Sequence, residues 1–102
     1  MIKQSFISVL ISSYNKENFI KKTINSCLDQ NYNKFEIIVV DTASEDNSKI
    51  ILNKFKKNKK IKLFFLKKKK FKHSPLNQIH AVQIGLKKAK GKIICLLDGD
   101  DR

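Results

Sequence analysis

The chain has 102 residues, with 22 Lys and Arg against nine Asp and Glu, and a formal net charge of +13. This length suits one small domain or part of a larger one, and 41% apolar residues are enough for a core, which argues against disorder. No apolar run approaches the roughly 20 residues of a membrane-spanning helix, so we expect no such helix. No cleavage site follows the first apolar stretch, so we expect no signal peptide. Two isolated cysteines, Cys27 and Cys95, indicate reduced thiols in the cytoplasm.

The positive charge is concentrated in one window. Residues 49–72 contain twelve lysines and no acidic residue, whereas the rest of the chain has ten basic and nine acidic residues. Such a block can bind nucleic acid or an anionic membrane. Sequence-reading nucleic-acid sites rely on arginine, however, and Arg102 is the one arginine of the chain. We interpret the window as a solvated face with a general attraction for anions. We therefore expect no specific nucleic-acid partner. Peripheral contact with an anionic membrane stays open.

Four short apolar runs alternate with three segments of helical period. The runs cover residues 6–11, 35–40, 61–66 and 92–97, and their nearly continuous apolar character predicts strands buried on both faces of a parallel sheet. The first helical segment carries one apolar stripe, in which Cys27 is a small core residue. The members of that stripe are Phe19, Ile20, Thr23, Ile24, Cys27 and Leu28.

The second and third helical segments follow the second and third runs. The second helix is predicted over residues 46–55, with Ile50, Ile51 and Phe55 facing inward. The third starts with Ser74 as its N-cap and Pro75 at its first position, and it stops at a left-handed Gly91. Its predicted inward positions are Leu76, Ile79, Val82, Gln83 and Leu86, with His80 beside them in a structural role.

Strand–helix–strand alternation predicts an α/β fold, a parallel sheet between two layers of helices. Ligands of such sheets bind at the carboxyl ends of the strands. Polar residues follow three of the four runs at that edge. They are Ser12, Ser13, Tyr14 and Asn15 after the first run, Asp41, Thr42, Ala43, Ser44, Glu45 and Asp46 after the second, and Asp98, Gly99, Asp100, Asp101 and Arg102 after the fourth.

The acidic residues after the fourth run have two interpretations. Three carboxylates within residues 98–101 repel one another unless solvent or a cation neutralises them, so they form either a solvated acidic turn or a site for Mg²⁺ or Mn²⁺. Asp41 can likewise cap the following turn, or it can accept a hydrogen bond from a ribose hydroxyl or a base N–H. With only Gly85, Gly91 and Gly99, no glycine-rich phosphate loop can be drawn, which excludes the usual dinucleotide and P-loop sites.

Taken together, these segments resemble family 2 of the nucleotide-sugar-dependent glycosyltransferases, an inverting family with the GT-A fold. Residues 12–15 read Ser-Ser-Tyr-Asn where the family has Pro-Thr/Ser-Tyr-Asn, and residues 26–30 match its Ser-x-x-x-Gln. Residues 36–46 correspond to Glu-Ile-Ile-Val-Val-Asp-Asp-Gly-Ser-x-Asp. Residues 81–91 correspond to Ala-Arg-Asn-x-Gly-Leu-x-x-Ala-x-Gly, and residues 97–101 to Leu-Asp-Ser-Asp-Asp. Five signatures occur in the right order over nearly the whole chain.

The resemblance implies a role for each matching residue. Nucleotide-sugar contacts are expected from Ser12, Ser13, Tyr14, Asn15, Asp41, Thr42, Asp98 and Gly99. Asp98 and Asp100 would form the metal-binding DXD motif, with Mn²⁺ or Mg²⁺ bridging the diphosphate and Asp100 as a direct ligand. The sugar of a nucleotide-diphosphate donor, with UDP as the expected nucleotide, would pass with inversion to a saccharide or lipid-linked acceptor. Relatives commonly build cell-envelope polysaccharide or glycolipid, which implies a cytoplasmic enzyme or one peripheral to the inner membrane face.

Three departures from the family pattern modify this expectation. Thr42 replaces the second acid of the family's Asp-Asp pair, and Val82 replaces an arginine near the phosphates. Lys72 is a candidate to supply the positive charge of that missing arginine. His73 is a further candidate neighbour of the nucleotide. Family catalytic domains are about twice as long as this chain, so residues 1–102 are expected to be a single, truncated, donor-binding half. The general base would lie in the missing carboxyl-terminal half. The alternatives are a lysine-rich anion-binding module and an inactive remnant.

Overall fold

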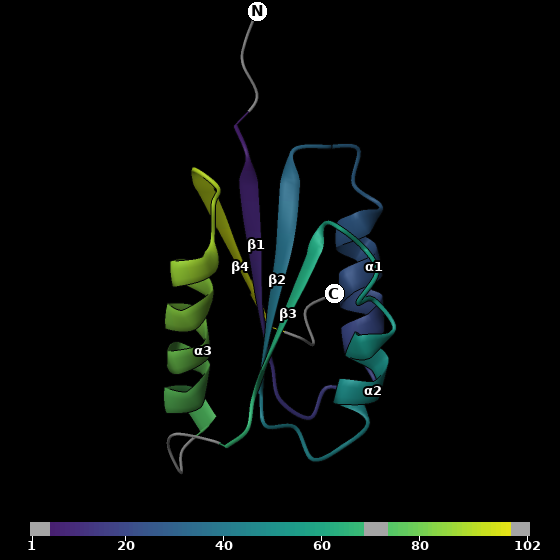
Figure 1. The fold of residues 1–102 in the computed structure, drawn as a ribbon, viewed down its shortest axis with the longest axis vertical. Helices are drawn as coiled ribbons and strands as arrows, with labels where there is room; N and C mark the ends of the chain where they lie inside the picture. Colours follow the sequence, from purple (N-terminus) through teal and green to yellow (C-terminus); the bar gives the residue numbers. More distant parts are fainter. Residues whose placement is uncertain (1–4, 69–73, 99–102) are drawn as a thin grey trace, which may run out of the picture.

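The computed structural model describes residues 5–68 and 74–98, the side chains of 74, 75 and 98 excepted. Four strands alternate with three helices along the chain (Figure 1). In chain order these elements are β1 (Ile7–Ser13), α1 (Ile20–Leu28), β2 (Phe35–Thr42), α2 (Ser48–Asn53), β3 (Ile61–Leu66), α3 (Ser74–Lys88) and β4 (Ile93–Asp98).

The strands form one sheet in the order β3-β2-β1-β4, and every neighbouring pair is parallel. Helices α1 and α2 cover one face and α3 covers the other, which gives three layers (Figure 1). The predicted α/β architecture is therefore confirmed. The parallel arrangement gathers the amino ends of the strands at one edge of the sheet and the carboxyl ends at the opposite edge.

The core lies on both faces of the sheet because β2, the second strand in the order, is buried along its whole length. Alternate residues of β1 and β2 contribute to opposite faces. The cluster beneath α1 and α2 contains Ile11, Ile20, Ile24, Phe35, Ile37, Val39, Leu52 and Ile61. The cluster beneath α3 contains Leu10, Ile38, Val40 and Ala81.

The strands extend further into polar sequence than the apolar runs predicted. β1 and β2 each run two residues beyond the predicted end, β3 matches its prediction, and β4 begins and ends one residue later. Ser12, Ser13, Asp41, Thr42 and Asp98 are therefore strand residues, not residues of the following loops. Backbone pairing accounts for this, because a parallel ladder uses main-chain groups and continues through polar side chains.

Helix α2 faces the core through a different side than predicted. Leu52 is fully buried, whereas Ile50, which was expected to face inward, is 61% exposed. Ile51 and Phe55 pack against the core from partly buried positions, as predicted. Ser48 is buried four residues before Leu52, so these two residues define the inward side and Ile50 projects away from it.

Helix α3 departs most from its predicted stripe. Leu76, Ile79, Gln83 and Leu86 are exposed, and the side toward the sheet carries Asn77, Ala81, Ile84 and Gly85. Small residues bring this helix close to β1, since a Cβ at Gly85 would lie 3.2 Å from Leu10 Cδ2. The predicted stripe of large apolar residues did not include this side, because three of its members, Asn77, Ala81 and Gly85, are small or polar.

Gly91 has a different role from the predicted left-handed cap. None of the described glycines has a positive φ, and α3 already ends at Lys88. A Cβ at Gly91 would lie 2.6 Å from Ser8 N and 2.8 Å from Phe6 O. Glycine is needed here because the α3–β4 connection passes directly against the backbone of β1.

A buried carboxylate holds that connection at the amino edge of the sheet. Glu36 accepts hydrogen bonds from Ser8 Oγ (2.7 Å), Lys62 Nζ (2.7 Å) and the backbone N–H of Lys90 (2.7 Å), and Gly91 N donates to Ser8 Oγ (2.8 Å). Burial alone would raise the pKa of Glu36, but these bonds and the charge of Lys62 lower it below its ordinary value. The Glu36 network thus ties β1, β2, β3 and the start of β4 together.

Strand β4 is an edge strand with apolar side chains on its surface. It pairs with β1 alone in the described sheet, and Ile93 and Leu96 are exposed. An exposed edge of this kind can pair with another chain and is an aggregation hazard.

Candidate functional site at the carboxyl edge

The candidate site is assembled by the register of the sheet. Ser13 of β1 pairs with Asp41 of β2, and Ser12 pairs with Asp98 of β4. Three segments that are far apart in the sequence thus deliver their predicted site residues to the same edge. Ser12, Ser13, Asp41 and Thr42 are buried, Tyr14 is half-buried and Asn15 is exposed.

Asp41 lies at the centre of this edge, with a fully buried side chain. Its Oδ2 accepts a hydrogen bond from the backbone N–H of Ser44 (2.9 Å), and its Oδ1 accepts one from the Ser44 hydroxyl. Ser44 Oγ in turn accepts from the backbone N–H of Asn15 (2.9 Å). Asp41 therefore caps the turn after β2, which is one of its two predicted roles. Through Ser44 it also fixes this turn to the end of β1.

Asn15 holds the same two loops together from the other side. Its Oδ1 accepts from the backbone N–H of Glu45 (2.8 Å) and of Asp46 (3.3 Å). Asn15 has a φ of 51° and Ala43 a φ of 59°, both in the left-handed region. Asparagine tolerates this region better than most residues, whereas alanine is strained there. The loops after β1 and β2 therefore act as one unit with a defined backbone shape.

Asp46 and Ser48 complete the connection between the loops. Asp46 Oδ2 accepts from the backbone N–H of Glu17 (3.1 Å), and Asp46 Oδ1 accepts from the backbone N–H of Ser48 (2.9 Å). Ser48 Oγ accepts from the backbone N–H of Lys16 (2.9 Å). Burial alone would raise the pKa of Asp46, but the hydrogen bonds from Ser48 and Glu17 lower it, so Asp46 stays ionised well below neutral pH.

One buried polar atom at this edge has no hydrogen-bond partner among the described residues. Ser13 Oγ is buried and makes no hydrogen bond to any of them, although Asp41, its neighbour in the register, accepts two from Ser44. Leaving a buried hydroxyl unpaired costs about 1–3 kcal/mol. Thr42, which stands in place of the family acid, donates from Oγ1 to the Ser13 carbonyl at 3.4 Å. The Ser13 hydroxyl is thus held in position without a hydrogen bond to another described residue.

The predicted metal-binding residues lie at or beyond the end of the described chain. The β4 backbone carries Asp98 to the same edge as Ser12. The acidic segment therefore starts at the carboxyl edge of the sheet, as predicted from its position after the fourth apolar run. Gly99, Asp100 and Asp101 lie outside the described residues, as do Lys72 and His73. Within residues 5–68 and 74–98, no group of three or more His, Cys, Asp and Glu is arranged to hold a metal ion.

A cavity of about 510 Å³ lies elsewhere, beneath α1 and beside β4. None of its described lining residues is charged, and such a lining does not suit a nucleotide diphosphate. Its lining residues are Ile7, Val9, Thr23, Ser26, Cys27, Gln30, Tyr32, Phe35, Cys95 and Leu97. The two cysteines are free but not isolated from each other, because they line this one cavity. Burial and the nearby Cys95 raise the pKa of Cys27, which keeps its thiol protonated and unreactive at neutral pH.

Sequence reasoning missed the residues that brace the site. Ser44, Asp46 and Ser48 were not assigned roles in it, yet their side chains accept the backbone N–H groups of the loop after β1. A local signal existed, since Ser and Asp residues just before a helix often satisfy free backbone donors. The partners in the first loop lie about 30 residues away, and no local pattern names them.

Comparison with known proteins identifies the family and the fold of the chain. The family model described as Glycosyl transferase family 2 matches residues 8–102. An uncharacterized glycosyltransferase of Haemophilus influenzae is 42% identical over 98 residues, which cover 93% of this chain and 36% of the relative. The chain thus spans about a third of that protein's length.

Two solved structures share the fold over nearly the whole chain. Staphylococcus aureus TarS 1-349 in complex with UDP has a TM-score of 0.75 at 28% identity, covering 93% of this chain and 27% of that one. The mannosyltransferase PcManGT of Pyrobaculum calidifontis, in complex with GDP-Man and Mn²⁺, has a TM-score of 0.81 at 23% identity, covering 96% and 28%. The predicted GT-A fold is confirmed over the amino-terminal portion. With the family match extending from residue 8 to residue 102, the chain belongs to glycosyl transferase family 2.

Proposed function

We propose that this chain supplies the donor-binding half of a glycosyltransferase that transfers a sugar from a nucleotide diphosphate to an acceptor hydroxyl with inversion. The observation that carries the proposal is the convergence of Ser12, Ser13, Asp41 and Asp98 at one edge of the sheet through strand register. Ligands of parallel α/β sheets bind at this edge. The chain also spans only about a third of the Haemophilus relative, in keeping with a part of a longer enzyme.

The nucleoside would lie over the ends of β1 and β2. Ser13 Oγ, which is buried without a hydrogen-bond partner among the described residues, is available to a ribose hydroxyl or to the base. Tyr14 is half-buried and offers a ring for stacking. Asp41 already accepts from Ser44, and a carboxylate has lone pairs left for a further donor. Asn15 contributes by fixing the loop, and Thr42 offers a hydroxyl where the family has a carboxylate. We expect UDP as the nucleotide, as in the TarS complex.

A divalent cation, Mn²⁺ or Mg²⁺, would be held by Asp98 and Asp100, with Gly99 allowing a close approach of the diphosphate. Carboxylate oxygens are the ligands that both ions prefer, and a Mn²⁺ ion accompanies GDP-Man in the PcManGT structure. When bound, such an ion neutralises the charge that develops on the departing nucleotide. The protein's own part is to hold the diphosphate against β4 and β1 so that the leaving group is positioned before transfer.

The acceptor and the general base would be supplied by sequence outside residues 1–102. We propose a saccharide or lipid-linked acceptor and a role in cell-envelope polysaccharide synthesis, on the family resemblance. Free cysteines are in keeping with a reducing cytoplasm. Among the described helices, none has the length and apolar character needed to cross a membrane. We expect the 102-residue chain alone to transfer no sugar.

Calorimetric titration of UDP into the 102-residue chain, with Mn²⁺ and with EDTA, tests the proposal. We expect binding that requires the metal and that is lost in Asp100→Ala. The matched control is Asp29→Ala, which removes an exposed carboxylate at the end of α1 and should leave binding unchanged. GDP in place of UDP tests the choice of base, with weaker binding expected.

Three results would contradict the proposal. A cooperatively folded chain that binds neither nucleotide would exclude a self-sufficient donor half. Metal-independent UDP binding that survives in Asp100→Ala but disappears at high salt would instead indicate a general anion-binding module. A chain without a cooperative thermal transition would support the inactive remnant.

A further inference from the structure

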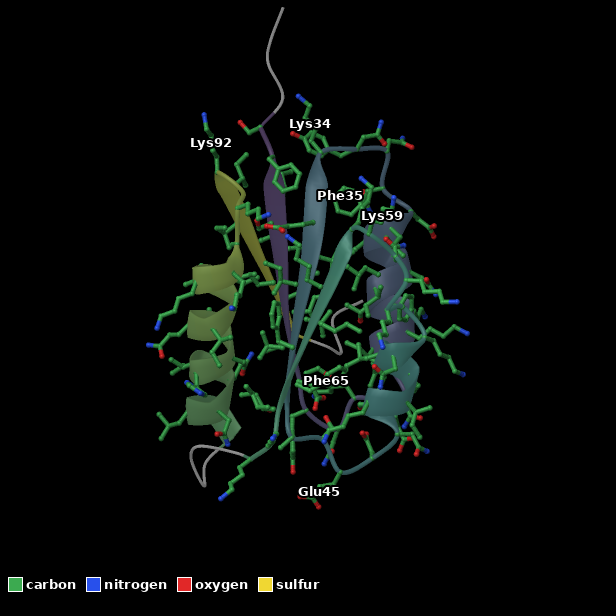
Figure 2. The ribbon with its side chains drawn as sticks, viewed as in Figure 1. Lys34, Phe35, Glu45, Lys59, Phe65 and Lys92 are labelled. Carbon is green, nitrogen blue, oxygen red and sulfur yellow. The ribbon has the colours of Figure 1, made fainter. Side chains whose placement is uncertain are left out.

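The amino edge of the sheet carries most of the net positive charge of the described residues. The connections that enter β2, β3 and β4 cover residues 29–34, 54–60 and 89–92, and they hold eight lysines against one carboxylate, Asp29. The described connections at the carboxyl edge, residues 14–19, 43–47 and 67–68, hold three lysines and three carboxylates. Figure 2 shows Lys34, Lys59 and Lys92 at one end of the molecule and Glu45 at the other.

Backbone hydrogen bonds place several of these lysines in a row across the edge. Lys34 O accepts from Ile7 N (2.9 Å), Phe6 O accepts from Lys92 N (2.9 Å), and Lys60 O accepts from Ile37 N (2.7 Å). The order across the sheet is therefore Lys60, Lys34, Phe6 and Lys92. We name Lys34, Lys59, Lys60, Lys90, Lys92, Phe6 and Ile93 the amino-edge surface.

Apolar side chains are exposed among these charges. Phe6, flanked by Lys34 and Lys92 in the register, is 37% exposed, and Ile93 on the neighbouring strand is also exposed. Lys60 is held in place, since its Nζ donates to Asn33 O (2.5 Å) and lies 4.3 Å from the centre of the Phe35 ring. Glu36, the acidic residue of β2 at this edge, is buried and bonded to Lys62, so it does not cancel the surface charge.

We propose that the amino-edge surface binds an anionic phospholipid membrane, with Phe6 entering the interface and the lysines contacting headgroups. Lysines that flank an exposed aromatic ring match both parts of such an interface, the anionic headgroups and the apolar boundary below them. Nucleic acid fits less well, because sequence-reading sites rely on arginine and no arginine occurs among the described residues. The candidate donor site, at the opposite edge, then faces away from the bilayer.

Single-tryptophan variants locate the contact, because the natural chain has no Trp. Phe6→Trp places the probe on the amino-edge surface, and Phe65→Trp places a matched probe, also 37% exposed, toward the other end of β3 (Figure 2). Vesicles of phosphatidylglycerol mixed with phosphatidylcholine should shift the Phe6→Trp emission to the blue and leave Phe65→Trp unchanged. A shift in Phe65→Trp alone, or in neither variant, would overturn the proposal.

Charge-reversal variants test the lysines at equal net charge. Lys34→Glu, Lys59→Glu and Lys92→Glu combined should weaken co-sedimentation with these vesicles about a hundredfold. The control combines Lys21→Glu, Lys22→Glu and Lys68→Glu, exposed lysines away from the amino edge, and should lose much less. Circular dichroism checks that both variants fold.

Three outcomes would count against the membrane. Equal losses in the two charge-reversed variants would mean a general attraction without a defined surface. Equal binding to vesicles of phosphatidylcholine alone would remove the anionic headgroup from the recognition. Tight binding of an RNA oligonucleotide to the same lysines, without a blue shift of Phe6→Trp on vesicles, would assign the surface to nucleic acid.

Discussion

At the carboxyl edge of the sheet, side chains of one loop bind backbone N–H groups of another, whereas at the amino edge a buried carboxylate is neutralised by a lysine. Asn15, Asp46 and Ser48 provide the first arrangement and Glu36 with Lys62 the second. The first leaves Ser13 Oγ without a partner among the described residues, and the second satisfies Glu36 with three bonds. The contrast teaches that the buried network beneath the amino-edge surface serves stability, whereas the buried groups of the carboxyl edge retain capacity for a ligand.

The largest effect is expected from Gly91→Ala at the amino edge. The new methyl group would meet the Ser8 backbone at 2.6 Å, and because backbone cannot move aside locally, we expect a loss of about 3 kcal/mol in the free energy of unfolding. Gly85→Ala is the matched control, since its methyl group meets only the Leu10 side chain at 3.2 Å and gains helix propensity. Urea denaturation of both variants measures the difference. Similar losses would mean that the α3–β4 connection has room for a side chain.

Glu36→Ala tests whether the buried Glu36 network contributes to stability and not to nucleotide binding. Removing this carboxylate leaves Lys62, Ser8 Oγ and Lys90 N without their acceptor. Because Lys62 is about one-third exposed and can be hydrated, we expect a moderate loss of about 2–3 kcal/mol. Thermal and urea unfolding give the loss, with exposed Glu45→Ala as a control expected within about 0.5 kcal/mol of the natural chain. Weaker UDP binding in a folded Glu36→Ala chain would break the proposed division between the edges.

Asn15→Ala tests the carboxyl edge in the opposite sense. The variant loses an acceptor for the backbone N–H groups of Glu45 and Asp46 and a side chain suited to a positive φ. We expect a loss of about 1–2 kcal/mol in stability and a larger fractional loss of UDP affinity, since the loop over the nucleotide is no longer fixed. Asn18→Ala, exposed in the same loop, should change neither quantity. An Asn15→Ala chain with normal affinity would show that the loop shape does not matter for binding.

The pH dependence of stability gives the smallest and finest test. Glu36 and Asp46 both have lowered pKa values in the folded chain. As the pH falls, these two carboxylates take up protons in the unfolded chain before they do so in the folded chain. Their contribution to the free energy of unfolding is therefore complete above the ordinary carboxyl pKa near 4. It is lost as the pH falls through the lowered pKa values of the folded chain. Urea denaturation between neutral pH and about pH 3 should show this decline, and Glu36→Gln should make it shallower. An unchanged profile in Glu36→Gln would assign the decline to other groups.

The sequence predicted the elements well where apolar residues determine them. The run at 61–66 matches β3 at both ends, because its boundary coincides with the change from apolar residues to lysines. β1 and β2 were cut short at Ser12 and Asp41, since periodicity follows side chains and the ladder follows the backbone. The inward side of α3 could not be found by the same rule, because close packing there depends on Ala81 and Gly85.

The candidate site was predicted in part. Strand-end logic placed residues 12–15, 41–46 and 98–102 at one edge of the sheet. The register brings Ser12, Ser13, Asp41 and Asp98 to that edge and adds the pairing of Ser13 with Asp41 and of Ser12 with Asp98. The bracing by Ser44, Asp46 and Ser48 and the Glu36 network depend on contacts between residues 26 to 54 positions apart. Such pairings follow from the folded backbone, so composition and spacing do not reveal them. The nucleotide and metal roles themselves stay predictions.

The left-handed backbone at Ala43 has a consequence for how this loop can change by mutation. A β-carbon in that region costs about 1–2 kcal/mol relative to glycine, so Ala43→Gly relieves strain and is reached by a single base change in an alanine codon. A branched residue such as valine, also one base away, adds crowding instead. A substitution at position 43 is therefore tolerated best when it introduces glycine, while the exposed Glu45 side chain two residues later tolerates changes that keep the backbone N–H bonded to Asn15 Oδ1.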